Sequence, residues 1–142
     1  VVVDDRDVVH VAWRKFSGGD NGIFYRRYDA SGKWSDEKFT ILGIARGGRS
    51  SGPVLSTDGV RTWCLWSYPG KGELGCRVLK NDTWSAEPTV VSVEPLGWNL
   101  ATPDRMPPDA DAIPVVFPRV TTTPKVPATE VLFKSIDLGT GR

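Results

Sequence analysis

Short runs in which apolar and polar residues alternate recur along the chain and are separated by turn residues. In Val8–Arg14, for example, Val9, Val11 and Trp13 fall on one face, because successive side chains of a strand point to opposite sides. No segment combines a helical period with capping residues. The pattern therefore predicts an all-β chain built from short strands.

The predicted strands belong to a unit that repeats about every 50 residues. Trp13 recurs as Trp66, 53 residues later, and Trp34 recurs as Trp84, 50 residues later. A third and weaker copy places Phe117 51 residues after Trp66. Recurrence at a fixed spacing indicates one supersecondary unit used several times.

Each of the first two units is predicted to contain four strands. The first unit has them at Val1–Val3, Val8–Arg14, Ile23–Tyr28 and Trp34–Ile41, and the second at Pro53–Ser56, Thr62–Tyr68, Glu73–Leu79 and Trp84–Val93. The same alignment places Arg27 over Arg77. Four strands in such a unit are typical of a β-propeller blade, whose sheet must stack on its neighbours to bury its faces. We therefore expect an incomplete propeller of about three blades, with units near residues 1–48, 49–98 and 99–142.

Composition and charge argue against two classes of partner. Lys and Arg total 18 against 17 Asp and Glu, so the formal net charge is +1 and no strong field attracts a polyanion. No apolar run is long enough to cross a bilayer as a helix. We therefore expect no nucleic acid and no membrane insertion, and we favour an extracellular or periplasmic location.

Two segments, Val8–Arg14 and Phe24–Tyr28, with the turn Gly32-Lys33-Trp34-Ser35, resemble the repeats of sialidase-like β-propellers, the group that carries bacterial neuraminidase repeats. The resemblance covers nearly the whole chain. The Asp box of that family has Ser, Asp, Gly and Trp at positions one, three, five and eight, whereas Ser56–Trp63 has its glycine at position four. We interpret this stretch as an Asp-Gly hairpin turn in which Gly59 takes a positive φ.

A second resemblance is to sugar-binding propeller lectins, in which a Gly-Trp-Ser turn precedes a Leu-Gly segment and a Gly-Pro strand. The corresponding residues here are Gly32, Trp34, Ser35, Leu42, Gly43, Gly52 and Pro53. Both resemblances imply carbohydrate recognition. Two other function classes stay open: a glycoside hydrolase or polysaccharide lyase whose catalytic residues lie partly outside this chain, and a propeller scaffold that binds protein.

The sialidase resemblance implies an active site with several arginines, a tyrosine nucleophile paired with glutamate, and an aspartate acid. Guanidinium groups bind a carboxylate in a bidentate manner, and arginines in or near predicted loops are Arg14, Arg46, Arg49, Arg105 and Arg119. Packing roles are favoured for the tyrosines on or beside predicted strands, Tyr25, Tyr28 and Tyr68. The family's Phe-Arg-Ile-Pro or Tyr-Arg-Ile-Pro opening is missing, so we assign no catalytic residue.

No cofactor or metal site is predicted. His10 is the one histidine of the chain, and its place within a strand favours a structural role. Asp4, Asp5 and Asp7 have the chemistry of calcium ligands, but the second unit has no matching cluster, which favours a solvated turn. The chain has no phosphate loop, serine elbow or paired-cysteine zinc spacing.

The two cysteines leave two interpretations open. If the turn between Tyr68 and Gly72 is centred on Gly70, Cys64 and Cys76 lie opposite each other on adjacent strands. A disulfide is geometrically possible at such a pair, and two buried reduced thiols are the alternative.

A ligand site is predicted where long loops gather at one end of the blades, since loop length beyond what a connection needs commonly marks function. These loops are Arg14–Asn21, Phe39–Gly52, Val93–Pro108 and Pro118–Thr129. Trp98 falls outside the repeat, so we predict that it stacks on a glycan. Polar contacts are predicted from Arg14, Asp20, Arg46, Arg49, Asn99, Asp104 and Arg105.

The last prediction of the sequence concerns partners. The third unit ends before its outer strand, and a stack of about three sheets leaves two faces and an edge open. We expect these surfaces to be covered either by further blades or by a second copy of the chain, which would make a ring of about six blades.

Overall fold

A computed structural model describes residues 1–17, 20–36, 40–43, 51–68, 72–92, 99–108, 110–121 and 128–137. Strands and no helix are found in these ranges, so the predicted all-β class is confirmed. Within the same ranges, accordingly, no helix has the length and apolar character needed to span a membrane.

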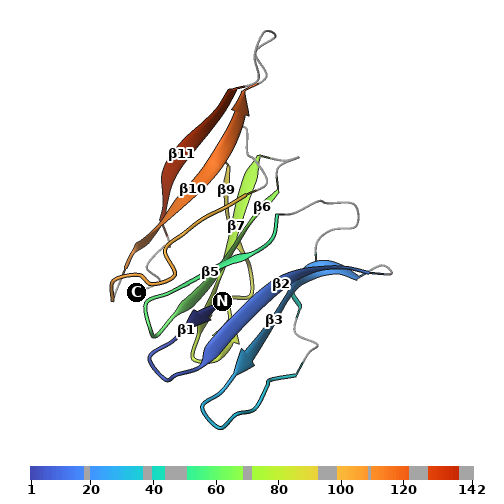
Figure 1. Cartoon of the computed structure of the whole chain (residues 1–142), viewed down its shortest axis with the longest axis vertical. Coiled ribbons are helices and arrows are strands. Elements are labelled where there is room, and N and C mark those ends of the chain that lie inside the picture. The colour runs from blue at the N-terminus through green and yellow to red at the C-terminus, as the bar shows by residue number, and fades with distance from the viewer. Residues whose placement is uncertain are drawn as a thin grey trace.

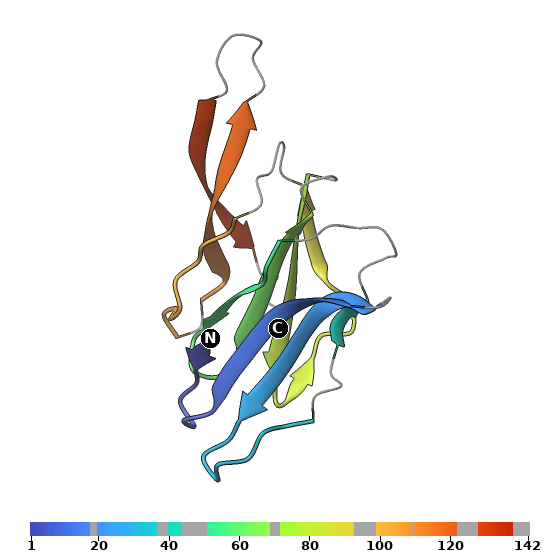
Figure 2. The same ribbon diagram turned by 45° about the vertical axis from the view of Figure 1, so that its right-hand side comes forward.

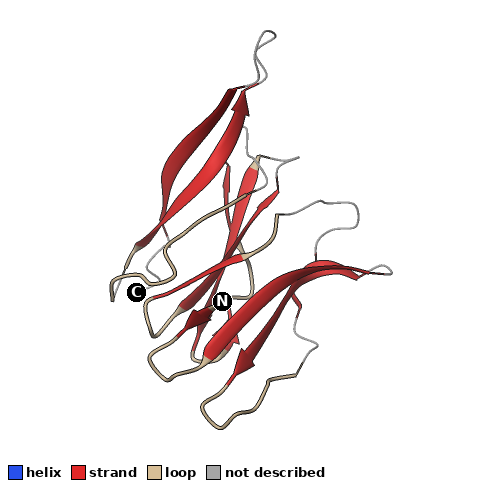
Figure 3. Ribbon diagram, in the orientation of Figure 1, coloured by secondary structure: helices blue, strands red, loops and turns tan. Residues whose placement is uncertain are grey.

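The strands form three antiparallel sheets that stack on one another (Figures 1 and 3). Sheet A contains β1 (Val2–Val3), β2 (Val9–Ser17), β3 (Asp20–Tyr28) and β4 (Thr40–Gly43), in that order. Sheet B contains β5 (Val54–Thr57), β6 (Thr62–Tyr68) and β7 (Glu73–Lys80), with β8 (Thr83–Trp84) and β9 (Thr89–Ser92) both paired to β7. Sheet C contains β10 (Ala112–Thr121) and β11 (Ala128–Asp137).

The fourth predicted strand of each unit differs from the prediction. Trp34 forms a single bridge to Tyr28, and β4 begins only at Thr40. In the second unit the predicted strand is divided into β8 and β9, which lie on either side of Pro88. A proline has no N–H to donate, which interrupts a hydrogen-bonded ladder.

Sheet B lies between the other two sheets, and its two faces enter different cores (Figure 2). Trp66 packs with Ile23 of sheet A, whereas Trp63 packs with Ile113 and Phe117 of sheet C. Consecutive side chains of β6 therefore point into opposite cores, and every residue from Thr62 to Ser67 is buried. A strand buried on both faces is the direct result of stacking sheets face to face.

The recurring Trp-Ser pair has a structural cause. The Ser35 hydroxyl accepts the Arg27 N–H at 3.0 Å, and the Ser35 N–H donates to the Arg27 carbonyl at 2.8 Å. Ser85 makes the same two hydrogen bonds with Val78, at 3.3 and 2.8 Å. Arg27 therefore corresponds to Val78, and its predicted alignment with Arg77 is wrong by one residue because the turn before the Trp-Ser pair is one residue longer in the first unit.

The turn after β1 is built around a buried carboxylate. Oδ1 of Asp4 accepts the N–H groups of Arg6 at 2.9 Å and Val8 at 3.0 Å, and the Asp4 side chain is 2% exposed. Burial alone would raise the pKa of Asp4, but these bonds and the Arg6 guanidinium hold it below the ordinary value. The prediction of a solvated turn is therefore wrong for Asp4.

The turn after β5 is also organised by a buried aspartate that accepts backbone N–H groups, a correspondence that the sequence alignment missed. Oδ1 of Asp58 accepts the N–H groups of Val60 at 3.0 Å and Arg61 at 2.6 Å. Gly59 follows with φ of 96°, which confirms the predicted hairpin turn and its glycine. The spacing of 53 residues between Trp13 and Trp66 aligns Asp5 with Asp58, whereas the hydrogen bonds make Asp4 the counterpart of Asp58, one residue away from that alignment.

Cys64 and Cys76 are free and buried on opposite faces of sheet B. The pairing places Cys76 opposite Leu65, and Tyr68 opposite Glu73, which is one residue away from the register that would pair Cys64 with Cys76. This difference of one residue in register moves the two thiols to different sides of the sheet, so of the two interpretations left open by the sequence the structure supports two buried reduced thiols.

Candidate functional site

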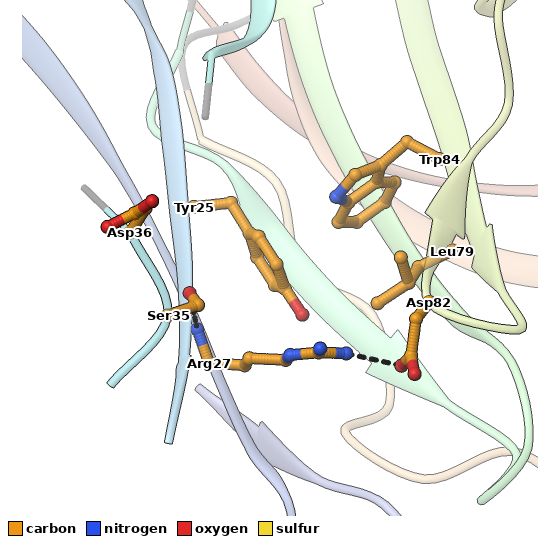
Figure 4. Close-up of a pocket in the computed structure, with 7 residues that line it drawn as sticks. All are labelled: Tyr25, Arg27, Ser35, Asp36, Leu79, Asp82 and Trp84. Atoms are coloured by element: carbon orange, nitrogen blue, oxygen red, sulfur yellow. Dashed lines mark hydrogen bonds and ion pairs between the residues drawn. The ribbon is translucent and has the colours of Figure 1, made fainter. Parts of the chain in front are cut away.

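A cavity of about 380 Å³ lies between sheets A and B. Strand β3 of sheet A contributes Tyr25 and Arg27, and the segment between β3 and β4 contributes Ser35 and Asp36 (Figure 4). Sheet B contributes Leu79 and Trp84, with Asp82 from the turn between β7 and β8. Cavities that bind small molecules have volumes of roughly 300–1,000 Å³, with apolar walls and a few polar groups. This cavity has the size and the mixed lining of a small-molecule site.

Two aromatic rings form one wall of the cavity. Tyr25 and Trp84 meet edge to face, with ring centroids 5.0 Å apart and an interplanar angle of 87°. Nε1 of Trp84 is buried and has no hydrogen-bond partner among the described residues. Buried N–H groups are almost always bonded, so this N–H would gain a hydrogen bond from a ligand once a small shift of the surrounding side chains exposed it to the cavity.

Charged side chains also line the cavity. The Arg27 guanidinium pairs with the Asp82 carboxylate, as Figure 4 shows, and Asp82 also accepts from Nη2 of Arg6 at 3.3 Å. Asp36 adds an exposed carboxylate. Since the side chains of Arg27 and Asp82 are 35% and 44% exposed, solvent weakens their attraction, and a polar ligand can replace either partner at low cost.

The Tyr25 hydroxyl is hydrogen-bonded to a buried histidine. Nδ1 of His10 lies 2.6 Å from the hydroxyl oxygen, and Nε2 of His10 lies 3.3 Å from Oδ2 of Asp4 without good hydrogen-bond alignment. His10 and Asp4 have side chains only 1% and 2% exposed. The prediction of a structural place for His10 within its strand agrees with this burial.

The protonation states follow from burial. Burial lowers the pKa of His10, although Asp4 opposes the shift, so His10 is neutral near pH 7. With the ionised Asp4 beside Nε2, the proton of the imidazole belongs on that nitrogen, and Nδ1 accepts the Tyr25 O–H. Burial also raises the pKa of Tyr25. The hydroxyl therefore stays protonated, and its oxygen can still accept a hydrogen bond from a ligand.

Two of the predicted contact residues lie on strands rather than in a loop. Arg14 lies inside β2 and pairs with Ile23 of β3, and Asp20 begins β3 and pairs with Ser17 of β2. Asp20 is seven residues from Arg27 along β3, roughly 23 Å in an extended strand. The predicted Arg14–Asn21 loop is therefore much shorter, and these two residues lie away from the cavity.

The predicted residues of the segment 99–108 lie elsewhere. Asn99 and Asp104 are exposed, and the Asp104 carbonyl accepts the Thr57 N–H at 3.0 Å. The Arg105 guanidinium pairs with Asp5, in the turn between β1 and β2. That turn is at the opposite end of β2 from Asp20, so the described members of the predicted set do not converge.

The remaining predicted contacts, Trp98, Arg46 and Arg49, lie outside the described residues, as does the side chain of Asp20. Arg119 of the arginine set lies in β10, and its side chain is also outside the described part. Their roles stay predictions.

Sequence reasoning missed the cavity because its residues belong to strands and short turns. A signal was present in the repeat. Tyr25 and Arg27 occupy the core-facing positions that Cys76 and Val78 occupy in the second unit. Where one repeat has polar residues at core-facing positions and its neighbour has apolar residues there, the polar residues indicate a candidate functional site.

No group of three or more His, Cys, Asp or Glu side chains in the described part of the chain is placed to hold a metal ion. Comparisons with known protein families, curated proteins and solved structures find no match to this chain. The case for a function therefore depends on the geometry of the site.

Proposed function

We propose that the chain is a carbohydrate-recognising segment of a β-propeller, and that its ligand binds in the cavity between sheets A and B. The blade interpretation is supported by the sequential strand order of sheets A and B and by their face-to-face stacking. Both are features of propeller blades.

The observation that carries the proposal is the combination of groups around the cavity. A sugar presents apolar C–H faces together with hydroxyls that donate and accept hydrogen bonds. The wall of Tyr25 and Trp84 suits the apolar face, and the unpartnered Nε1 of Trp84 suits a hydroxyl oxygen. Asp36 and Asp82 can accept from hydroxyls, and Arg27 can donate to them.

Binding is measured first on an array of immobilised mono- and oligosaccharides and then by calorimetric titration with the sugar that binds best. Trp84→Phe keeps an aromatic ring and removes the N–H, so we expect the affinity to fall about tenfold, the value of one hydrogen bond. Trp34→Phe is the matched control, because Trp34 is the counterpart of Trp84 and lies on the outer face of sheet A. The affinity of the Trp34→Phe variant for the same sugar should stay unchanged.

A second variant separates this cavity from the loop site predicted from the sequence. If Trp98→Ala abolishes binding while Trp84→Phe leaves it unchanged, the ligand binds at the loops and the cavity assignment is wrong. Absence of binding to every sugar on the array would reject carbohydrate recognition itself. Turnover of reporter glycosides by the same protein would favour the glycosidase alternative.

A further inference from the structure

Among the described residues, no sheet covers the two outer faces of the stack, and both faces carry exposed apolar side chains, with Lys15 and Arg26 over the rings of Phe24 and Trp34 on the face of sheet A. The outer face of sheet A, here called the leading face, carries Val3, Trp13, Phe24, Tyr28 and Trp34. The outer face of sheet C, here called the trailing face, carries Val116, Val131 and Phe133. Val131 is 73% exposed and Phe133 is 71% exposed. Contiguous exposed apolar side chains commonly mark an interaction surface.

The repeat identifies what covers the leading face. Tyr28 and Trp34 are the counterparts of Leu79 and Trp84, because each pair joins the third strand of its unit to the Trp-Ser segment. Tyr28 and Trp34 are 38% and 50% exposed, whereas Leu79 and Trp84 are 5% and 7% exposed. The difference arises because sheet A covers this face of sheet B. The leading face of sheet A therefore corresponds to the face of sheet B that another sheet covers.

The trailing face has the complementary character. Leu132 lies opposite Phe117 as Gly75 lies opposite Trp66, so Val131 and Phe133 correspond to Leu74 and Cys76. Those two residues are 1% and 4% exposed because sheet C covers them. The same positions in sheet A, Ile23 and Tyr25, are covered by sheet B.

We propose that the trailing face of one copy of this chain packs on the leading face of a second copy, in the way that sheet A packs on sheet B. Each copy carries one face of each kind, so two copies can cover all four faces by two identical head-to-tail contacts. A contact between two different faces closes into a ring when the rotation allows it, and a dimer is the smallest such ring. The occupant of each face is thus a sheet of the same repeat, supplied by the second copy.

The first test is the mass of the purified chain by analytical ultracentrifugation, from low to high micromolar concentration. A dimer is expected. Trp34→Glu in the leading face and Phe133→Glu in the trailing face each place a charge in the proposed contact. Each should raise the dissociation constant about 30-fold or more, the effect of losing a main contact residue. Val60→Glu is the matched control, because Val60 is 68% exposed in the turn between β5 and β6 and lies on neither face.

A mixing experiment tests the head-to-tail arrangement. Trp34→Glu protein keeps an intact trailing face, and Phe133→Glu protein keeps an intact leading face. An equimolar mixture therefore restores one unaltered contact and should contain heterodimer at concentrations where each variant alone is monomeric. Thermal unfolding of each variant shows that it is folded, which is expected because both side chains are largely exposed. A monomeric mass of the unaltered chain at every concentration, or a mixture that stays monomeric, would overturn the proposal.

Discussion

Replacing Gly75 with alanine tests the packing between sheets A and B. Gly75 lies opposite Trp66 in sheet B, and the indole of Trp66 lies across the space that a side chain would fill. A β-carbon at this position would be 2.5 Å from Nε1 of Trp66 and closer still to two carbons of the same ring. Trp66 is 1% exposed within the core formed with Ile23, Leu55 and Leu79.

The cost of this overlap can be estimated. Overpacking a well-packed core typically costs about 1–3 kcal/mol. For a chain of 142 residues this corresponds to a fall in Tm of roughly 3–10 °C. Urea and thermal unfolding followed by tryptophan fluorescence measure both quantities. Gly52→Ala is the matched control, because no atom lies within 4 Å of its added β-carbon, so its stability should be unchanged or slightly raised.

A second substitution shows whether Trp66 is the cause. Phenylalanine in place of Trp66 lacks the indole nitrogen and the second ring, which the methyl group of alanine at position 75 would otherwise contact. In a double-mutant cycle, Trp66→Phe should therefore relieve the cost of Gly75→Ala by about 1 kcal/mol or more. Strictly additive effects, or a Gly75→Ala protein as stable as the Gly52→Ala control, would refute the proposed packing.

Two further predictions concern His10 and the cysteines. Because burial lowers the pKa of His10 below 6.5, the unfolded chain takes up a proton that the folded chain does not, so the free energy of unfolding should decrease as the pH falls below 6.5. His10→Gln should flatten this dependence between pH 7 and 5 in urea titrations, and an unchanged slope would contradict the assignment. Denatured protein should show equal free-thiol counts before and after reduction, because Cys64 and Cys76 lie on opposite faces; additional thiols after reduction would show a disulfide.

The strands could be predicted from the sequence because alternation is a local property. Thr62–Tyr68 is confirmed at both of its ends. Turn lengths could not be predicted, and in a β-sheet an error of one residue moves each side chain to the other face. One residue of register decides whether Cys64 or Leu65 lies opposite Cys76, and one residue of turn length separates the predicted alignment of Arg27 with Arg77 from its observed correspondence with Val78.

The cavity could be predicted only in part. Tyr25 and Arg27 are visible as polar residues at core-facing positions, once the register is known. Their partners Asp82 and Trp84 come from the next unit, more than fifty residues away, and meet them only because the sheets stack. Loop length directed the prediction to the other end of sheet A, where Asp20 lies.

The junction between sheets A and B differs from the junction between sheets B and C in a way that packing does not require. His10, Tyr25 and Arg27 of sheet A point toward sheet B, and the corresponding residues of sheet B that point toward sheet C are Trp63, Cys76 and Val78. Burying polar groups costs stability unless each finds a partner, and the second junction is formed without such a set. The comparison of the two junctions shows that sheets of this repeat can stack without such a polar set, which supports the proposal that the polar residues of the first junction also contact a ligand. The polar lining, rather than the fold alone, makes the cavity the proposed ligand site.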